Sequence, residues 1–237
     1  MRFVEPGLCA AVVLGAISMS ACTTQEAPST PTGLRLEIEG TGVSWTALEE
    51  VQAELRQIGV GVWPLRLDEA PDDIRQLLSQ SSLTDEETAR IRDHFLLPRE
   101  RLLEIIAASG RAPNVAGGGA LETAVANQDY GYPQLWVVQG DVDYTRFDRF
   151  HVNTAEDGTG VDEVLQMLSG EGVIVRVRQP DGTIYNLRVD CSSDEACWMF
   201  SYDAGQHHIG SLSSATPGTK LVVQAFGPRE WSLRYVE

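Results

Sequence analysis

The period of the hydrophobic pattern changes near Tyr130, and this change constrains the fold more than any other feature of the 237-residue sequence. Between residues 44 and 110, apolar residues recur at helical intervals. Between residues 130 and 237, they alternate with polar residues, as in strands that bury one face. Six strands are predicted in this second part, over residues 135–138, 173–178, 184–189, 198–202, 221–226 and 231–236. Most connections between them are too short for crossover helices, which favours antiparallel pairing.

The predicted fold class is therefore α+β. It consists of an N-terminal helical part followed by a mainly antiparallel β-sheet, arranged as a sandwich or half-barrel. Residues 34–39 alternate as a first strand, and residues 161–168 are predicted to form a short helix that ends at Gly170. Two helix starts have the spacing of a capping box, Thr46 with Glu49 and Thr84 with Glu87.

The N-terminal segment has the layout of a signal peptide, with Arg2 before an apolar run over residues 8–19. Twelve apolar residues are too few for a transmembrane helix, which needs about 20. The run ends in Met19-Ser20-Ala21-Cys22, which resembles the lipobox of bacterial lipoproteins. The resemblance implies removal of residues 1–21, acylation of Cys22 and attachment to a membrane. Because Thr23 and not aspartate follows the cysteine, the resemblance favours attachment to the outer membrane, facing the periplasm or the cell surface, over attachment to the inner membrane.

The domain organisation follows from the same segment. Residues 22–33 contain the lipidated cysteine and a polar stretch without large apolar residues, which is expected to be a flexible tether. Residues 34–237 are expected to form a single globular domain, helix-rich over 44–110 and β-rich over 130–237, because no second linker or internal repeat is visible.

Two of the four cysteines remain after the signal peptide and Cys22 are set aside. Cys191 and Cys197 lie between two predicted strands, and in the oxidising compartment that export implies they are expected to form a disulfide. A zinc or redox pair is the alternative. It is less favoured because zinc pairs have two to four intervening residues and further ligands nearby, whereas the five residues between these cysteines include no further cysteine or histidine.

The net charge is −16, and it stays at −16 when residues 1–21 are removed, since they contain one basic and one acidic residue. This charge makes nucleic acid an unfavourable partner. The expected partners are the membrane, through acylated Cys22, and an unknown small ligand or envelope protein.

Aromatic residues are concentrated over residues 130–151, where they are interleaved with acidic and basic side chains. Such a mixture suits a ligand that has both apolar and polar surfaces. The alternative is a pair of strands whose aromatic side chains fill the core. The candidate ligand-binding residues are Tyr130, Tyr132, Trp136, Asp141, Asp143, Tyr144, Arg146, Arg149 and His151.

Three histidines are candidate metal ligands: His151, His207 and His208. A cupin-like site, with histidines and an acid inside a β-barrel, would place them together. The sequence has no His-x-His with a following Glu at the usual distance and no glycine-framed second motif of that family. No catalytic residue is assigned, and no cofactor is predicted beyond a possible metal ion at these histidines.

The main hypothesis from the sequence is a membrane-anchored extracytoplasmic lipoprotein that acts as a non-catalytic ligand-binding or accessory module of the cell envelope. Two alternatives remain open. One is a cupin-like metal-dependent enzyme that uses His151 with His207 or His208, and the other is a structural envelope protein that recruits a basic protein partner through its acidic surface.

Overall fold

The structure is a computed structural model of the whole chain, and it describes residues 33–115, 124–125, 133–139, 144–191 and 197–237. Within these ranges the chain forms two mainly antiparallel β-sheets and four α-helices, so the α+β class is confirmed. None of the described helices is long and apolar enough to span a membrane.

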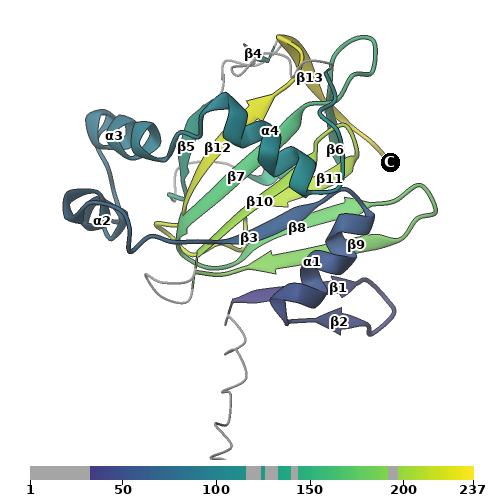
Figure 1. Cartoon of the computed structure of the whole chain (residues 1–237), viewed down its shortest axis with the longest axis horizontal. Coiled ribbons are helices and arrows are strands. Elements are labelled where there is room, and N and C mark those ends of the chain that lie inside the picture. The colour runs from purple at the N-terminus through teal and green to yellow at the C-terminus, as the bar shows by residue number, and fades with distance from the viewer. Residues whose placement is uncertain (1–32, 116–123, 126–132, 140–143, 192–196) are drawn as a thin grey trace, which may run out of the picture.

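The larger sheet has eight strands in the order β2-β1-β9-β8-β11-β6-β13-β4 (Figure 1). In chain order these strands are β1 (Leu34–Ile38), β2 (Ser44–Trp45), β4 (Ala124–Val125), β6 (His151–Thr154), β8 (Val173–Arg178), β9 (Ile184–Val189), β11 (His207–Ser211) and β13 (Glu230–Tyr235). Only the pairing of β13 with β4 is parallel in this sheet. The predictions for β8 and β9 are confirmed to the residue, and β1 ends one residue earlier than the predicted strand, whereas β6 and β11 were not predicted.

The smaller sheet has five strands in the order β3-β10-β7-β12-β5. They are β3 (Gly61–Leu65), β5 (Gln134–Val137), β7 (Asp162–Ser169), β10 (Cys197–Asp203) and β12 (Lys220–Phe226). The predicted helix over residues 161–168 is wrong, because this segment is the central strand β7. Seven of its eight residues are buried, since both faces of the strand are covered, and a strand without an exposed face has no alternating pattern.

The helices are α1 (Leu48–Gln57), α2 (Asp72–Leu78), α3 (Asp85–Phe95) and α4 (Arg99–Ala108). Figure 1 shows α4 lying across the five-stranded sheet, where Leu102 and Ile105 pack on Val164 and Met199. Helices α2 and α3 cover another part of the same face, and α1 packs against β3 and β1. The helices are not simply N-terminal to the sheets, because β1, β2 and β3 precede or separate them.

One of the two predicted capping boxes is confirmed. Thr84 accepts a hydrogen bond from the backbone N–H of Glu87, and the Glu87 carboxylate accepts one from the backbone N–H of Thr84. The other is wrong: α1 has Ala47 at its N-cap and no side-chain cap. Thr46 therefore precedes the N-cap and cannot make the expected contact.

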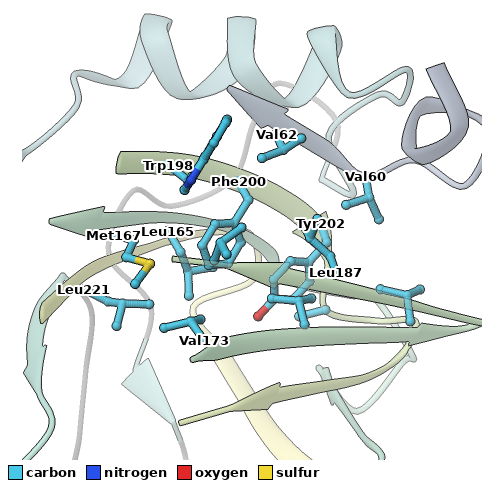
Figure 2. Close-up of a cluster of buried hydrophobic side chains, with 14 of the residues drawn as sticks. Val60, Val62, Leu165, Met167, Val173, Leu187, Trp198, Phe200, Tyr202 and Leu221 are labelled. Carbon is cyan, nitrogen blue, oxygen red and sulfur yellow. The ribbon is translucent and has the colours of Figure 1, made fainter. Parts of the chain in front are cut away.

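The main core lies between the two sheets (Figure 2). Leu165, Phe200 and Tyr202 extend from the five-stranded sheet toward Val173 and Leu187 of the eight-stranded sheet. All five side chains are at least 97% buried. This inter-sheet layer contains the polar residues described below.

Cys191 and Cys197 form a disulfide with a Cα–Cα distance of 4.5 Å, as the sequence suggested. Cys197 begins β10, and Cys191 follows β9, so the bond joins the end of a strand in one sheet to the start of a strand in the other. The disulfide therefore links the two sheets and does not close a hairpin within one of them.

Candidate functional site

Two histidines meet inside the core on neighbouring strands of the eight-stranded sheet. His151 of β6 and His208 of β11 are directly opposite each other in the antiparallel register, and their ring centroids are 4.2 Å apart. Both side chains are almost completely buried, at 2% and 1% exposure. Burial of two adjacent imidazole rings is costly unless their polar atoms have partners.

Each ring has one nitrogen fixed by a backbone carbonyl. Nδ1 of His151 is 2.8 Å from the carbonyl oxygen of Arg149, and Nδ1 of His208 is 2.9 Å from that of Gln206. A carbonyl oxygen can only accept, so Nδ1 donates its proton in both cases. In a neutral imidazole this arrangement leaves Nε2 unprotonated, with a lone pair that can bind a metal or accept a proton.

Both histidines are neutral at pH 7. Burial lowers the pKa of His151 to about 4, with a further contribution from neighbouring His208. Burial likewise lowers the pKa of His208 to about 4. The two Nε2 lone pairs are therefore available over the whole physiological pH range.

Three polar residues form a hydrogen-bonded group beside the histidines. Glu163 of β7 is only 3% exposed and accepts a hydrogen bond from the Tyr202 hydroxyl at 2.7 Å. Its other carboxylate oxygen accepts one from Nδ2 of Asn153 at 2.9 Å. Burial raises the pKa of the Glu163 carboxyl, while these two hydrogen bonds and the nearby His151 act in the opposite direction. Within the described residues, no lysine or arginine is among the groups that act on it.

These residues line a small cavity between the sheets. Its volume is about 20 Å³, enough for one water molecule or one ion but not for an organic substrate. Polar lining comes from His151, Asn153, Glu163, Tyr202 and His208. The other walls are mainly apolar, and they include Trp136, Phe147, Leu165, Val173, Val175, Phe200 and Leu212.

A buried ion pair holds the end of β7 next to this cavity. Arg111 pairs with Asp162, the residue before Glu163, and also donates to the Ser201 hydroxyl at 2.9 Å. Asp162 is fully buried. Its second carboxylate oxygen accepts from the backbone N–H of Asn114 at 2.8 Å. The pair therefore fixes the segment after α4 against the two strands that carry Glu163 and Tyr202.

The structure brings part of the predicted aromatic stretch to the cavity. Trp136 and His151 line it, and Trp136 stacks on Phe147 with a centroid distance of 5.1 Å. Tyr144 packs against Trp136 at 6.2 Å and donates its hydroxyl proton to the Val137 carbonyl oxygen. Trp136 and Phe147 thus form one wall of the cavity, and Tyr144 packs against them within the main core.

The remaining candidates lie elsewhere. Arg146 stacks over Phe147, and Arg149 stacks over Tyr235, 4.1 Å from its ring centroid, but neither arginine lines the cavity. His207 is exposed and does not line the cavity either, so of the two adjacent histidines it is His208 that faces His151. Five predicted residues lie outside the described ranges: Cys22, Tyr130, Tyr132, Asp141 and Asp143.

Asn153, Glu163 and Tyr202 were not predicted as site residues. His151 and Asn153 are two apart, so a strand over 151–154 would have placed both on one face, but the segment was not recognised as a strand. Glu163 was assigned to a helix that is in fact β7. The one signal in the sequence was therefore the spacing of His151 and Asn153.

A metal ion fits this cavity in size and in donor chemistry. Two unprotonated imidazole nitrogens suit zinc, iron, copper or nickel. Asn153 Oδ1 is buried and has no hydrogen-bond partner among the described residues, and the buried Glu163 carboxyl group has no lysine or arginine among the described groups that act on it. Among the described residues, however, no three His, Cys, Asp or Glu side chains are already spaced to hold one ion. The histidine pair is in place, and an oxygen ligand from Asn153 or Glu163 would have to shift toward it.

Comparison with known proteins identifies the fold. No protein-family model matches the sequence, and no curated protein matches it either. Among solved structures, the chain is similar to one titled "Acireductone dioxygenase from Bacillus anthracis with cadmium ion in active center", with a TM-score of 0.58 and 18% sequence identity. The match covers 86% of this chain and 98% of the other. At this identity the similarity establishes a shared fold.

This similarity corrects three expectations from the sequence. The main hypothesis of a non-catalytic binding or accessory module is contradicted by the similarity to the structure of a metal-containing enzyme. The expectation of no cofactor is contradicted by the metal ion in the active centre of that enzyme. The classification as an envelope lipoprotein with a binding-protein domain is contradicted by the same finding. Residues 1–32 are outside the described part, so the localisation remains a prediction.

Proposed function

We propose that the domain is a cupin-like metal-dependent enzyme in which His151 and His208 bind a divalent transition metal. The observation that carries this proposal is the pair of buried, neutral imidazoles, each with Nδ1 held by a backbone carbonyl, on an ion-sized cavity. A bound cation would also favour the ionised form of the Glu163 carboxyl group, whose pKa is raised by burial.

The side chains around the cavity have distinct roles in this proposal. His151 and His208 supply nitrogen ligands, and Asn153 Oδ1 or the Glu163 carboxylate supplies an oxygen ligand. A bound metal would supply Lewis-acid or redox chemistry to a substrate oxygen. The name of the structurally similar enzyme favours an oxygenase reaction for this chain as well.

The remaining residues orient and shield the reacting groups. The Arg149 and Gln206 carbonyls fix the orientation of the two rings, and Tyr202 holds one oxygen of Glu163. Trp136, Phe147 and Phe200 contribute apolar surface that excludes water and would contact an apolar part of the substrate. Because the cavity holds only one water or ion, substrate binding requires these walls to move.

Elemental analysis of the purified protein tests the proposal. We expect about one equivalent of a transition metal per chain after equilibration with the metal and removal of excess. His151→Gln and His208→Gln should each lose it while keeping a folded circular dichroism spectrum. His94→Gln and His207→Gln are matched controls on exposed positions of α3 and β11, and they should retain the metal. Retention of a full equivalent by His151→Gln would contradict the proposal.

A further inference from the structure

A second site lies on the other side of β11 from the cavity. His208 faces the cavity, whereas its neighbour His207 lines a groove of about 640 Å³ together with Arg178, Gln179, Gln206 and Glu237. The groove and the cavity share no lining residue. We propose that this groove binds a small carboxylate that has a hydroxyl or amine group next to it, with Arg178 as the anchor.

Arg178 is held in place but uses only part of its hydrogen-bonding capacity. Its guanidinium group stacks on Phe150, 4.3 Å from the ring centroid, and this contact limits its rotamer freedom. Its Nη2 donates to the main-chain oxygen of Glu237 at 2.6 Å. Its Nε is buried without a partner among the described residues.

Nε and Nη2 are the two adjacent donors that a guanidinium group presents to a carboxylate. The one Glu237 oxygen that Nη2 contacts satisfies one of them, whereas the two oxygens of a ligand carboxylate satisfy both through parallel hydrogen bonds. A carboxylate ligand that displaces Glu237 from Arg178 therefore adds a charge-assisted hydrogen bond that the free protein lacks.

Two further polar atoms of the groove define the rest of the ligand. Gln179 Nε2 is a donor without an acceptor, and Gln206 Oε1 is an acceptor without a donor, among the described residues. The donor suits a carboxylate oxygen. The acceptor requires an N–H or O–H group, which a hydroxy acid or an amino acid carries next to its carboxylate. His207, directly opposite Arg178 in the β11–β8 register, adds another polar group at the edge.

The net charge of the protein limits where a carboxylate can bind. With a net charge of −16, the protein repels anions at long range, so a carboxylate binds only where a local cation outweighs that repulsion. Most arginines on this face of the sheet are already neutralised: Arg35 pairs with Glu37, Arg176 with Glu39 and Arg188 with Asp190. Among the described residues, Arg178 pairs with no Asp or Glu side chain, and its Nη2 contacts the main-chain oxygen of Glu237 instead.

Nuclear magnetic resonance titration with L-lactate tests the proposal. We expect saturable shifts of the Arg178 Nε–H and of the Gln179 and Gln206 side-chain amide signals. Propionate, which lacks the hydroxyl, should bind more weakly. Arg178→Gln should weaken lactate binding at least about 10-fold, since it removes a charged hydrogen-bond donor pair. Arg188→Gln, on the same face but outside the groove, should bind lactate as the wild type does.

A second variant covers the possibility that Arg178→Gln does not fold. Gln179→Glu lies in the β8–β9 turn, keeps the side-chain shape and replaces the donor by an anion, so it should also abolish binding. Absence of saturable shifts up to about 50 mM lactate, or wild-type affinity of Gln179→Glu, would overturn the proposal. Propionate binding as tight as that of lactate would overturn the assignment of Gln206 Oε1 as the acceptor for the ligand hydroxyl group. The titration is run on metal-free and metal-equilibrated protein, so its outcome is independent of the cavity.

Discussion

His151 and His208 face each other across the β6–β11 pair with ring centroids 4.2 Å apart, and each ring is held by a carbonyl two residues before it in the sequence. At both strands the backbone carbonyl oxygen of residue i therefore accepts a hydrogen bond from the histidine ring of residue i+2. These two hydrogen bonds orient both rings before any ion binds, which reduces the conformational entropy lost on metal binding.

The histidine pair should make the metal-free protein sensitive to acid. The folded pKa of both residues is about 4, against 6.5 when exposed, so the stability linked to their neutral form is complete above pH 6.5 and lost as the pH falls toward 4. The full shift corresponds to about 3 kcal/mol per histidine. Urea denaturation at pH 7 and pH 5 measures the loss.

The double variant His151→Gln, His208→Gln isolates this effect. It should lose much less stability between pH 7 and pH 5 than the wild type, whereas His94→Gln should behave as the wild type. An equal loss in the double variant and the wild type would show that other groups cause the acid sensitivity. Glu163 cannot cause it, because a raised carboxyl pKa lowers stability as the pH rises.

The Arg111–Asp162 pair should be important for stability. Arg111→Met leaves the fully buried Asp162 without its cation, and we expect the free energy of unfolding to fall by about 3–5 kcal/mol. Arg188→Met removes an exposed pair with Asp190 and should cost less than about 1 kcal/mol. Chemical denaturation of both variants measures the two losses of unfolding free energy. Similar losses would contradict the stabilising role of the Arg111–Asp162 pair.

Burial on both faces misled the prediction for β7 but not for β10 and β12, which are also buried along nearly their whole length and were predicted as strands. β8 alternates between buried and half-buried residues, and β9 alternates over its last three, and the boundaries of both strands were predicted correctly. β7 is covered by α4 on one side and by the other sheet on the opposite side, so its sequence lacks alternation and was interpreted as a helix. Burial on both faces is a tertiary property that a local pattern cannot reveal.

The site was predictable only in part for a similar reason. His151 and Trp136 lie in the aromatic stretch that attracted attention, but their partners Glu163, Tyr202 and His208 come from β7, β10 and β11. The pairing of β11 with β6 brings His208 to His151, and no sequence spacing encodes that pairing. The choice of His208 over His207 likewise depended on which face of β11 is turned inward.

Lys220 is the single lysine in the sequence and should anchor the end of α2. It is 1% exposed, and its ammonium group donates to the carbonyl oxygens of Leu78, Gln80 and Gly218 at 2.6–3.0 Å. Lys220→Met leaves these acceptors unpaired and should cost at least about 2 kcal/mol. Hydrogen exchange should accelerate in α2 more than in α4.

The matched variant for this position is Lys220→Arg. A planar guanidinium group is not shaped for three oxygens that surround a single nitrogen, so it should not restore wild-type stability. Full stability and unchanged exchange in α2 for Lys220→Arg would show that charge alone matters there.

The disulfide should contribute a moderate amount of stability. It closes a short loop, with a sequence separation of 6, so the Cys191→Ser, Cys197→Ser variant should be destabilised by about 2 kcal/mol in the chain-entropy model. Denaturation of the wild type under reducing conditions should give the same loss. A loss below about 0.5 kcal/mol in both experiments would contradict this contribution.

Anomalous diffraction from crystals equilibrated with a transition metal tests the central claim most directly. The account predicts one strong peak in the cavity between the sheets, about 2.0–2.2 Å from Nε2 of both His151 and His208. Asn153 Oδ1 or a Glu163 oxygen should complete the coordination. Peaks found only on surface side chains, with the cavity occupied by water, would contradict the assignment of a metal centre.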